Sequence, residues 1–513
     1  MSGGSHHERA LEFMRVSRFF RLGHLPTERP HPETRRLSDW AKTDLPTAVA
    51  VLKGIDVQAL DTLQRYAHEI DGLARSIEAT LDRGRRIFLC GCGATGRLSL
   101  SLEFLWRHEY CGDDRVRSFM AGGDVALVHS LEGFEDHRAF GARHLREMGF
   151  SDGDLLVSCT EGGETPYVIG ATEEAARISS NPPYFLYCNA NSELVDSIQR
   201  FRRVYDNPKI HKLCLYVGPM ALAGSTRMQA STVLQLAVGA ALLHSRQPAR
   251  DLISDFSVKV QETDFSFIAD FIEAETSIYL AGDHVHYQVQ DYGITVFTDT
   301  TERAPTFSLV PFDQLEEKRP QYSLCYVSVT SADNAEDAWL ELLNRSPRPL
   351  SWPEVDPRTS SEYLYGFDFS AHALDRRRRQ IPGKSHHELR IQRSPRGISL
   401  RLGGLAHEIE AGSMPDLLQH LLLKQALNIH STLVMGRMGR YKNNLMTWVS
   451  PTNGKLVDRA IRYVRHLLAD AGHTGRRYEE IAGQLFVEME RADPGESVVM
   501  RTYQALIRES ATH

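Results

Sequence analysis

The hydrophobic pattern of the chain alternates between short continuous apolar runs and longer segments with helical spacing. The runs at 86–90, 116–120, 155–159, 184–188 and 213–217 are apolar without alternation, which is typical of strands covered on both faces. Segments 98–108, 124–131, 137–148, 167–177 and 192–201 lie between them and predict helices, and a long helix is expected at 226–244. Strands alternating with helices predict a parallel sheet with helices on both faces.

The regions around this first unit have different patterns. Residues 57–82 carry apolar positions at three- and four-residue steps, which predicts a long amphipathic helix leading into the first strand. Residues 1–45 are polar and proline-rich, and we expect an irregular arm there.

A second, less regular series of predicted strands and helices follows a connecting helix at 251–272. Strands are predicted at 277–281, 294–298, 308–311, 323–329 and 363–367, helices at 335–343 and 414–435, and a hairpin over 388–402 around Pro395 and Gly397. Segments 231–245 and 421–435 look alike and each ends its series, which indicates a duplicated unit.

We therefore expect an α/β fold of two tandem, doubly wound units, each a mainly parallel five-stranded sheet flanked by helices. The predicted division is an arm at 1–45, a first unit at 46–248, a second, degenerate unit at 249–453 and a short helical tail at 454–513.

A glycine-rich turn follows the first predicted strand, at Gly91–Arg97 (GCGATGR). Glycines let the backbone approach a bound group closely, and a helix that starts at such a turn offers free N–H groups to an anion. The GxGxxG spacing also occurs in dinucleotide-binding folds and in plain structural turns. A dinucleotide site needs an acid about 20 residues further on, and Asp124 comes late, after two loop glycines. We favour a phosphate site, with a structural turn as the alternative.

Composition narrows the class of protein. The chain of 513 residues has a net charge of −7 and 42% hydrophobic residues, which is ordinary for a globular protein and gives no general attraction to nucleic acid. No signal-peptide or membrane-spanning pattern occurs, and we expect no membrane partner. Seven cysteines, most of them in apolar runs, indicate reduced thiols in a cytoplasmic protein. No metal or cofactor is expected.

Several ordered motifs resemble the sugar isomerase (SIS) family. They are Gly91–Arg97, Ala121–Gly123, Glu132–Asp136 (EGFED), Thr165–Gly170 (TPYVIG) and Gly218–Met228 (GPMALAGSTRM). More narrowly, they are similar to the branch of N-acetylmuramic acid 6-phosphate etherase and the glucokinase regulatory protein, as are Leu25–Glu28, Asn444–Met446 and Pro451–Ile461. The etherase has one unit and pairs with itself, so the two-unit plan is that of the regulatory protein.

The resemblance implies a sugar-phosphate site, with no cofactor. The turn would supply Gly93, Ala94, Thr95 and Gly96, and a second loop Thr160, Gly162, Gly163 and Thr165; Ser225 is a further candidate ligand. Glu161 and Glu164 depart from the family pattern and would repel a phosphate unless they turn outward or meet a cation. Lys424 matches the lysine that the regulatory protein brings to the site from its second unit; the alternative is a surface lysine.

The etherase family uses two glutamates as acid and base. The first corresponds to Glu135, whereas the position of the second is Leu105 in this chain. Glu103 is a nearby substitute, but two residues along a helix it points about 200° away.

Three functions stay open at this point. The first is a regulatory-protein-like sensor of a hexose or amino-sugar phosphate, such as N-acetylmuramic acid 6-phosphate or a fructose phosphate. The second is an etherase-type lyase with Glu135 and Glu103, and the third an aldose–ketose isomerase. A homodimer is an open alternative, whereas a kinase partner is not expected, because the tail after Ala469 is short.

Overall fold

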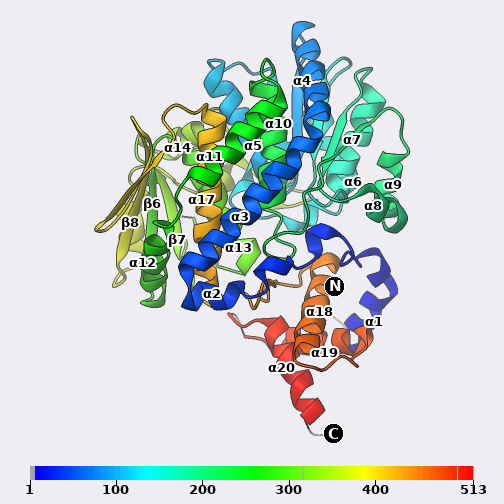
Figure 1. The fold of residues 1–513 in the computed structure, drawn as a ribbon, viewed down its shortest axis with the longest axis vertical. Helices are drawn as coiled ribbons and strands as arrows, with labels where there is room; N and C mark the ends of the chain where they lie inside the picture. Colours follow the sequence, from blue (N-terminus) through cyan, green and yellow to red (C-terminus); the bar gives the residue numbers. More distant parts are fainter. Residues whose placement is uncertain (1–5, 315, 494, 512–513) are drawn as a thin grey trace.

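The computed structural model describes residues 6–314, 316–493 and 495–511, and it contains two five-stranded sheets (Figure 1). The first sheet has the order β2-β1-β3-β4-β5 and is parallel throughout. Its strands are β1 (Ile87–Gly91), β2 (Val116–Met120), β3 (Leu155–Cys159), β4 (Tyr184–Tyr187) and β5 (His211–Cys214). Every residue of β1, β3 and β4 is buried, in agreement with the continuous apolar runs.

Helices cover both faces of this sheet. The α5 crossover runs from β1 to one side and the α7 crossover from β3 to the other, so right-handed connections put these helices on opposite faces. Helix α10 packs with both α4 and α5, and α6 packs with α7. The helices of this half are α3 (Leu45–Leu63), α4 (Ala67–Asp82), α5 (Ala94–Glu109), α6 (Arg138–Glu147), α7 (Pro166–Ile178), α8 (Asn191–Ser197), α9 (Gln199–Tyr205) and α10 (Gln229–Leu243). The single helix predicted at 57–82 is divided between α3 and α4.

The second sheet is mixed, unlike the mainly parallel sheet expected there. Its order is β10-β9-β8-β6-β7: β6 pairs in parallel with β7 and β8, whereas β8, β9 and β10 are antiparallel neighbours. The strands are β6 (His284–Val289), β7 (Cys325–Val329), β8 (His386–Ser394), β9 (Gly397–Leu402) and β10 (Leu405–Glu410). The predicted hairpin is confirmed as β8 and β9.

Several strands predicted in this half are wrong. Segments 277–281 and 294–298 lie in helices α12 (Ile268–Leu280) and α13 (Gly293–Phe307), 363–367 overlaps α15 (Ser361–Tyr365), and 308–311 is not a strand. Short apolar runs of this kind are compatible with a helix or a strand, and tertiary packing made 277–280 and 294–298 helical, whereas 309–311 forms neither. The other helices are α11 (Ala249–Glu262), α14 (Ala335–Leu343), α16 (Ala373–Gln380) and α17 (Asp416–Arg437).

Helix α17 runs through the middle of the molecule, between the two halves (Figure 1). It is buried from Leu417 to Gly436 and packs against α2 (Leu37–Thr43), α3, α10, α12 and α13. A helix buried on all sides needs partners for its polar side chains, and α17 finds them in both halves.

The arm and the tail pack together at one end of the molecule (Figure 1). The arm is more ordered than expected, with helices α1 (His6–Val16) and α2 (Leu37–Thr43) on either side of the proline-rich stretch. The tail consists of α18 (Gly454–Asp470), α19 (Tyr478–Arg491) and α20 (Val498–Ala511), and α1 packs on α19. The division at residues 45, 248 and 453 stays a prediction. None of the described helices is both long and apolar enough to cross a bilayer.

Candidate functional site

The turn between β1 and α5 is built by close backbone packing. A Cβ on Gly91 would lie 2.2 Å from the carbonyl carbon of Thr95, and one on Gly96 would lie 2.6 Å from the Cβ of Met120. Gly93 has φ of +57°, a conformation that suits glycine. Helix α5 therefore begins at Ala94, with its first N–H groups beyond the reach of helical acceptors.

The start of α5, at Gly93 and Ala94, lines a cavity of about 250 Å³. Its walls come from the arm, the first half, α13 of the second half and the tail, so remote parts of the sequence meet there. Of the residues predicted to bind the ligand, six line the cavity: Gly93, Ala94, Glu135, Gly162, Thr165 and Ser225.

Four other predicted ligand residues lie behind the wall. The hydroxyl of Thr95 accepts from the Cys92 N–H and donates to the Cys92 carbonyl, both at 2.9 Å. Both hydrogen bonds lie within the turn itself. The hydroxyl of Thr160 pairs with that of Thr165 at 3.0 Å. Gly96 packs on Met120, and the remaining residue, Gly163, packs on Leu194.

Lys455, at the start of α18, is the central cation of the cavity. Its Nζ lies 2.8 Å from a carboxylate oxygen of Glu164 and 3.5 Å from one of Glu135. Burial alone would lower the pKa of Lys455, but the two carboxylates raise it above its usual range. Arg200 also pairs with Glu164, and despite burial the two cations hold the pKa of Glu164 well below its ordinary value. Glu164 thus meets cations, and it does not stand free against a phosphate.

A second ion pair ties the arm to the tail beside the cavity. Arg459 donates two hydrogen bonds to Glu28, at 2.5 and 3.1 Å, and Arg462 donates a third at 2.8 Å. Burial would raise the pKa of Glu28, but the two arginines lower it to about 2. Such bidentate pairs fix geometry as well as charge.

Unlike Glu164 and Glu28, Glu161 has a carboxylate oxygen without a partner in the part of the chain that the structure describes. Its side chain lines the cavity, it is 8% exposed, and its Oε1 has no hydrogen-bond partner among the described residues. Burial, followed by the nearby Glu302, raises the pKa of Glu161 to about 7. Burial also raises the pKa of Glu302, which lies on α13 in the same wall.

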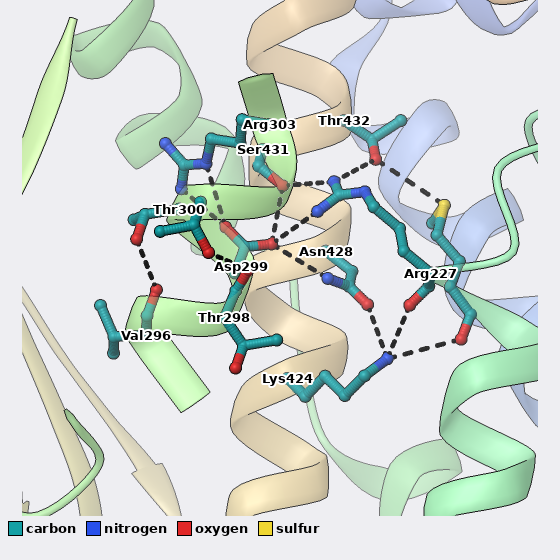
Figure 2. Close-up of polar contacts among 12 residues, drawn as sticks. Arg227, Val296, Thr298, Asp299, Thr300, Arg303, Lys424, Asn428, Ser431 and Thr432 are labelled. Atoms are coloured by element: carbon teal, nitrogen blue, oxygen red, sulfur yellow. Dashed lines mark hydrogen bonds and ion pairs between the residues drawn. The ribbon is translucent and has the colours of Figure 1, made fainter. Parts of the chain in front are cut away.

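Arg227 connects the cavity to a buried polar network shown in Figure 2. Asp299 accepts from Arg227 at 3.0 Å and from Arg303 at 2.8 Å, and Ser431 on α17 accepts from Arg227 at 2.7 Å. Despite burial, the two arginines lower the pKa of Asp299. The network holds Arg227, from the loop before α10, against both α13 and α17.

Lys424 belongs to this network and does not line the cavity, contrary to the position that the resemblance implied (Figure 2). Its Nζ donates to the Arg227 carbonyl and to Thr232 at 2.8 Å each, and to Asn428 at 3.0 Å. Burial lowers the pKa of Lys424 to about 8. The lysine is therefore neither a surface residue nor a cavity ligand; it supports the loop that carries Arg227.

Glu103 also lies away from the cavity. Its carboxylate accepts from Arg345 at 3.1 Å, from Arg348 at 2.9 Å, from Arg107 at 3.1 Å and from Ser118 at 2.5 Å. Burial would raise its pKa, but the arginines lower it to about 2. Glu103 attaches the loop after α14 to α5 and β2, and this geometry gives it no access to a ligand in the cavity.

Three buried polar atoms in the cavity wall have no partner among the described residues: Ser225 Oγ, Glu161 Oε1 and Arg227 Nε. Buried polar atoms are nearly always hydrogen-bonded, so these three atoms mark a place in the wall where a ligand or water can form hydrogen bonds. Among the residues that the structure describes, no group of three or more histidine, cysteine or acidic side chains is arranged to hold a metal.

Several residues of the wall are not predicted from the sequence, notably Arg97, Glu302, Lys455 and Arg459. Arg97 and Lys455 lie inside the motifs that carry the resemblance, but a motif does not show the direction in which a side chain points. Glu302 lies in no motif, and the pattern just before it predicts a strand where the structure has α13.

The comparisons with known proteins agree with these motifs. Residues 69–175 match the model of the glucokinase regulatory protein N-terminal SIS domain. The chain is 28% identical over 242 residues to N-acetylmuramic acid 6-phosphate etherase 1 of Bacillus licheniformis, which covers 46% of this chain and 75% of that protein. It is 32% identical over 220 residues to the N-acetylmuramic acid 6-phosphate etherase of Thermosynechococcus vestitus, covering 42% of this chain and 66%, just under two thirds, of that protein.

Among solved structures, a tagatose-6-phosphate ketose/aldose isomerase from Escherichia coli is similar over 78% of this chain and 97% of its own, with a TM-score of 0.43 and 12% identity. The sequence matches and the motifs agree on one conclusion. They support a relationship to the SIS family, and within it to the branch that contains N-acetylmuramic acid 6-phosphate etherase and the glucokinase regulatory protein.

Proposed function

We propose that the chain binds a phosphorylated sugar in the cavity at the start of α5. The observation that carries this proposal is the open helix start at Gly93 and Ala94, which faces the cavity beside Arg97. Helix N-termini favour phosphate through free N–H groups and the helix dipole. Arg97 donates to the carbonyls of Ala126 and Leu127 and pairs with no carboxylate among the described residues, so its charge is available to an anion.

Within this proposal we favour an etherase-type lyase acting on N-acetylmuramic acid 6-phosphate over a sensor without turnover. The relatives that share the motifs are named as such etherases. Glu135, at the position of one catalytic glutamate of that family, lines the same cavity and lies next to Lys455. A carboxylate at this place can serve as the base that the elimination needs.

The test is a binding and turnover screen on the full chain. Thermal shift is measured against glucose, glucosamine, fructose and N-acetylmuramic acid 6-phosphates, and against the unphosphorylated sugars. A ligand at 100 times its Kd adds about 2.7 kcal/mol to the free energy of unfolding, so binding gives a clear shift. We expect binding of phosphorylated sugars alone, and lactate release from N-acetylmuramic acid 6-phosphate.

Binding without lactate release supports the sensor, and conversion of an aldose phosphate to a ketose phosphate supports an isomerase. No shift with any sugar phosphate contradicts the proposal as a whole. A homodimer, the absence of a kinase partner and a cytoplasmic location stay predictions.

A further inference from the structure

The proposed lyase lacks one of its two proton-transfer groups at the position that the family motif assigns. Leu105 occupies that position, and it is 2% exposed. The neighbouring Glu103 is held by arginines away from the cavity. An elimination that needs both an acid and a base must therefore find its second group elsewhere in the wall.

We propose that Glu161 is this second proton-transfer group and acts with Glu135 on the bound sugar phosphate. This inference rests on the proposed function. Glu161 follows β3, in the loop before α7, so it enters the cavity from a different strand than the motif glutamate would. Its Oε1 has no hydrogen-bond partner among the described residues. A bound ligand can form the missing hydrogen bond.

The other carboxylates of the wall are less suited to donate a proton. Glu164 is held by Lys455 and Arg200, and Glu28 by Arg459 and Arg462, so both stay ionised. Glu302 is the remaining candidate. It lies in the electrostatic field of Arg97, Arg227 and Lys424, which favour its charged form, whereas the cation that acts on Glu161 is Lys455.

The groups around Glu161 come from several elements. They are Glu302 on α13, Lys455 on α18, Cys92 after β1, Cys159 at the end of β3 and Cys188 after β4. Burial raises the pKa of all three thiols, so they stay neutral near pH 7. Glu161 and Glu135 thus sit in one cavity in opposite settings, one buried without an ion pair and one beside a lysine, which is how acid and base roles are divided between carboxylates.

The step balances without a further reactant. The Glu135 carboxylate takes a proton from the carbon next to the sugar carbonyl, and that electron pair forms a carbon–carbon double bond. The bond from the next carbon to the ether oxygen breaks, with its pair left on oxygen. Glu161 gives its proton to this oxygen, which leaves as the hydroxyl of the hydroxy acid. Glu135 ends protonated and Glu161 ionised. Transfer of one proton from Glu135 to Glu161 then returns both side chains to their starting states.

The experiment compares wild type with Glu161→Gln, Glu302→Gln and a surface control, Glu262→Gln, at the exposed end of α11. Thermal shift reports binding of N-acetylmuramic acid 6-phosphate, and lactate release reports turnover. General acid–base groups contribute about 10²- to 10⁴-fold. We expect Glu161→Gln to bind within threefold of wild type and to release lactate at least 100-fold more slowly, while Glu302→Gln loses less than tenfold.

A second readout separates an acid role from loss of structure. In D₂O, Glu161→Gln still exchanges the proton of the sugar carbon that Glu135 removes, as followed by NMR, whereas Glu135→Gln does not. The inference is overturned if Glu161→Gln releases lactate at the wild-type rate, if Glu302→Gln alone loses turnover, or if wild type binds the substrate without turnover. If wild type binds no sugar phosphate at all, the proposed function itself has failed.

Discussion

Replacing Glu161 by glutamine is expected to stabilise the protein without ligand, by an amount that grows as the pH rises from about 4.5 to 7. The pKa of this carboxyl moves from 4.5 to about 7 on folding because burial penalises its charged form. Each pKa unit is worth about 1.4 kcal/mol, so the buried acid costs about 3 kcal/mol once the unfolded chain is fully ionised.

The sign follows from proton linkage. Below pH 4.5 the carboxyl is protonated in both states and costs nothing. Between pH 4.5 and 7 the unfolded state ionises first, so wild type loses stability as the pH rises, and above pH 7 the loss is complete. Glutamine does not titrate, so the variant should match wild type near pH 4.5 and exceed it by up to about 3 kcal/mol at pH 8.

The assay is urea unfolding of both proteins and of the Glu262→Gln control at pH 5 and pH 8, without ligand. The gain in the urea midpoint of Glu161→Gln over wild type should be larger at pH 8 than at pH 5, and the control should show none. An equal gain at both values, or a loss at pH 8, refutes the reasoning that Glu161 is a buried acid without an ion pair.

Three further perturbations test the packing around the cavity. Glu103→Gln should weaken folding above pH 5, where its carboxylate is ionised, and leave sugar-phosphate binding unchanged; weaker binding measured by titration calorimetry would place Glu103 in the site after all. Gly91→Ala puts a methyl group 2.2 Å from the Thr95 backbone and should greatly reduce the melting temperature, whereas Gly54→Ala, with no atom within 4 Å, should keep or raise it. Asp299→Asn breaks a buried pair and should cost about 3–5 kcal/mol in chemical unfolding; a cost under 1 kcal/mol would contradict the network in Figure 2.

The first sheet could be predicted because its signals are local. The strand from Ile87 to Gly91 and the turn after it are fixed by an uninterrupted apolar run and by glycine spacing. In the second half, the run at 294–298 has the same local appearance, but it belongs to α13, whose burial is decided by contacts with α5 and α17. Short apolar runs of this kind are settled by packing that the sequence pattern does not contain.

The residues of the site also fall into two groups, those that the local sequence predicts and those that only the fold brings to the cavity. The backbone at Gly93 and Ala94 follows from the turn itself, so sequence reasoning found it. The sequence predicts Thr95 as a ligand, but a threonine at a turn can equally form hydrogen bonds with the backbone of the turn, and here its hydroxyl bonds the backbone of Cys92. Lys455 lies 291 residues after Glu164 in the chain, and only the folded arrangement brings its ammonium group to that carboxylate.

The most direct test of the account is calorimetric titration of wild type and Ala94→Asp with a hexose 6-phosphate. Ala94 is the first residue of α5 and lines the cavity. An acidic residue in the first turn favours the helix, so the variant should fold, but its carboxylate would occupy the place that we assign to the phosphate. The account predicts binding by wild type and at least 100-fold weaker binding by Ala94→Asp at an unchanged melting temperature. Equal affinity in the two proteins would contradict it.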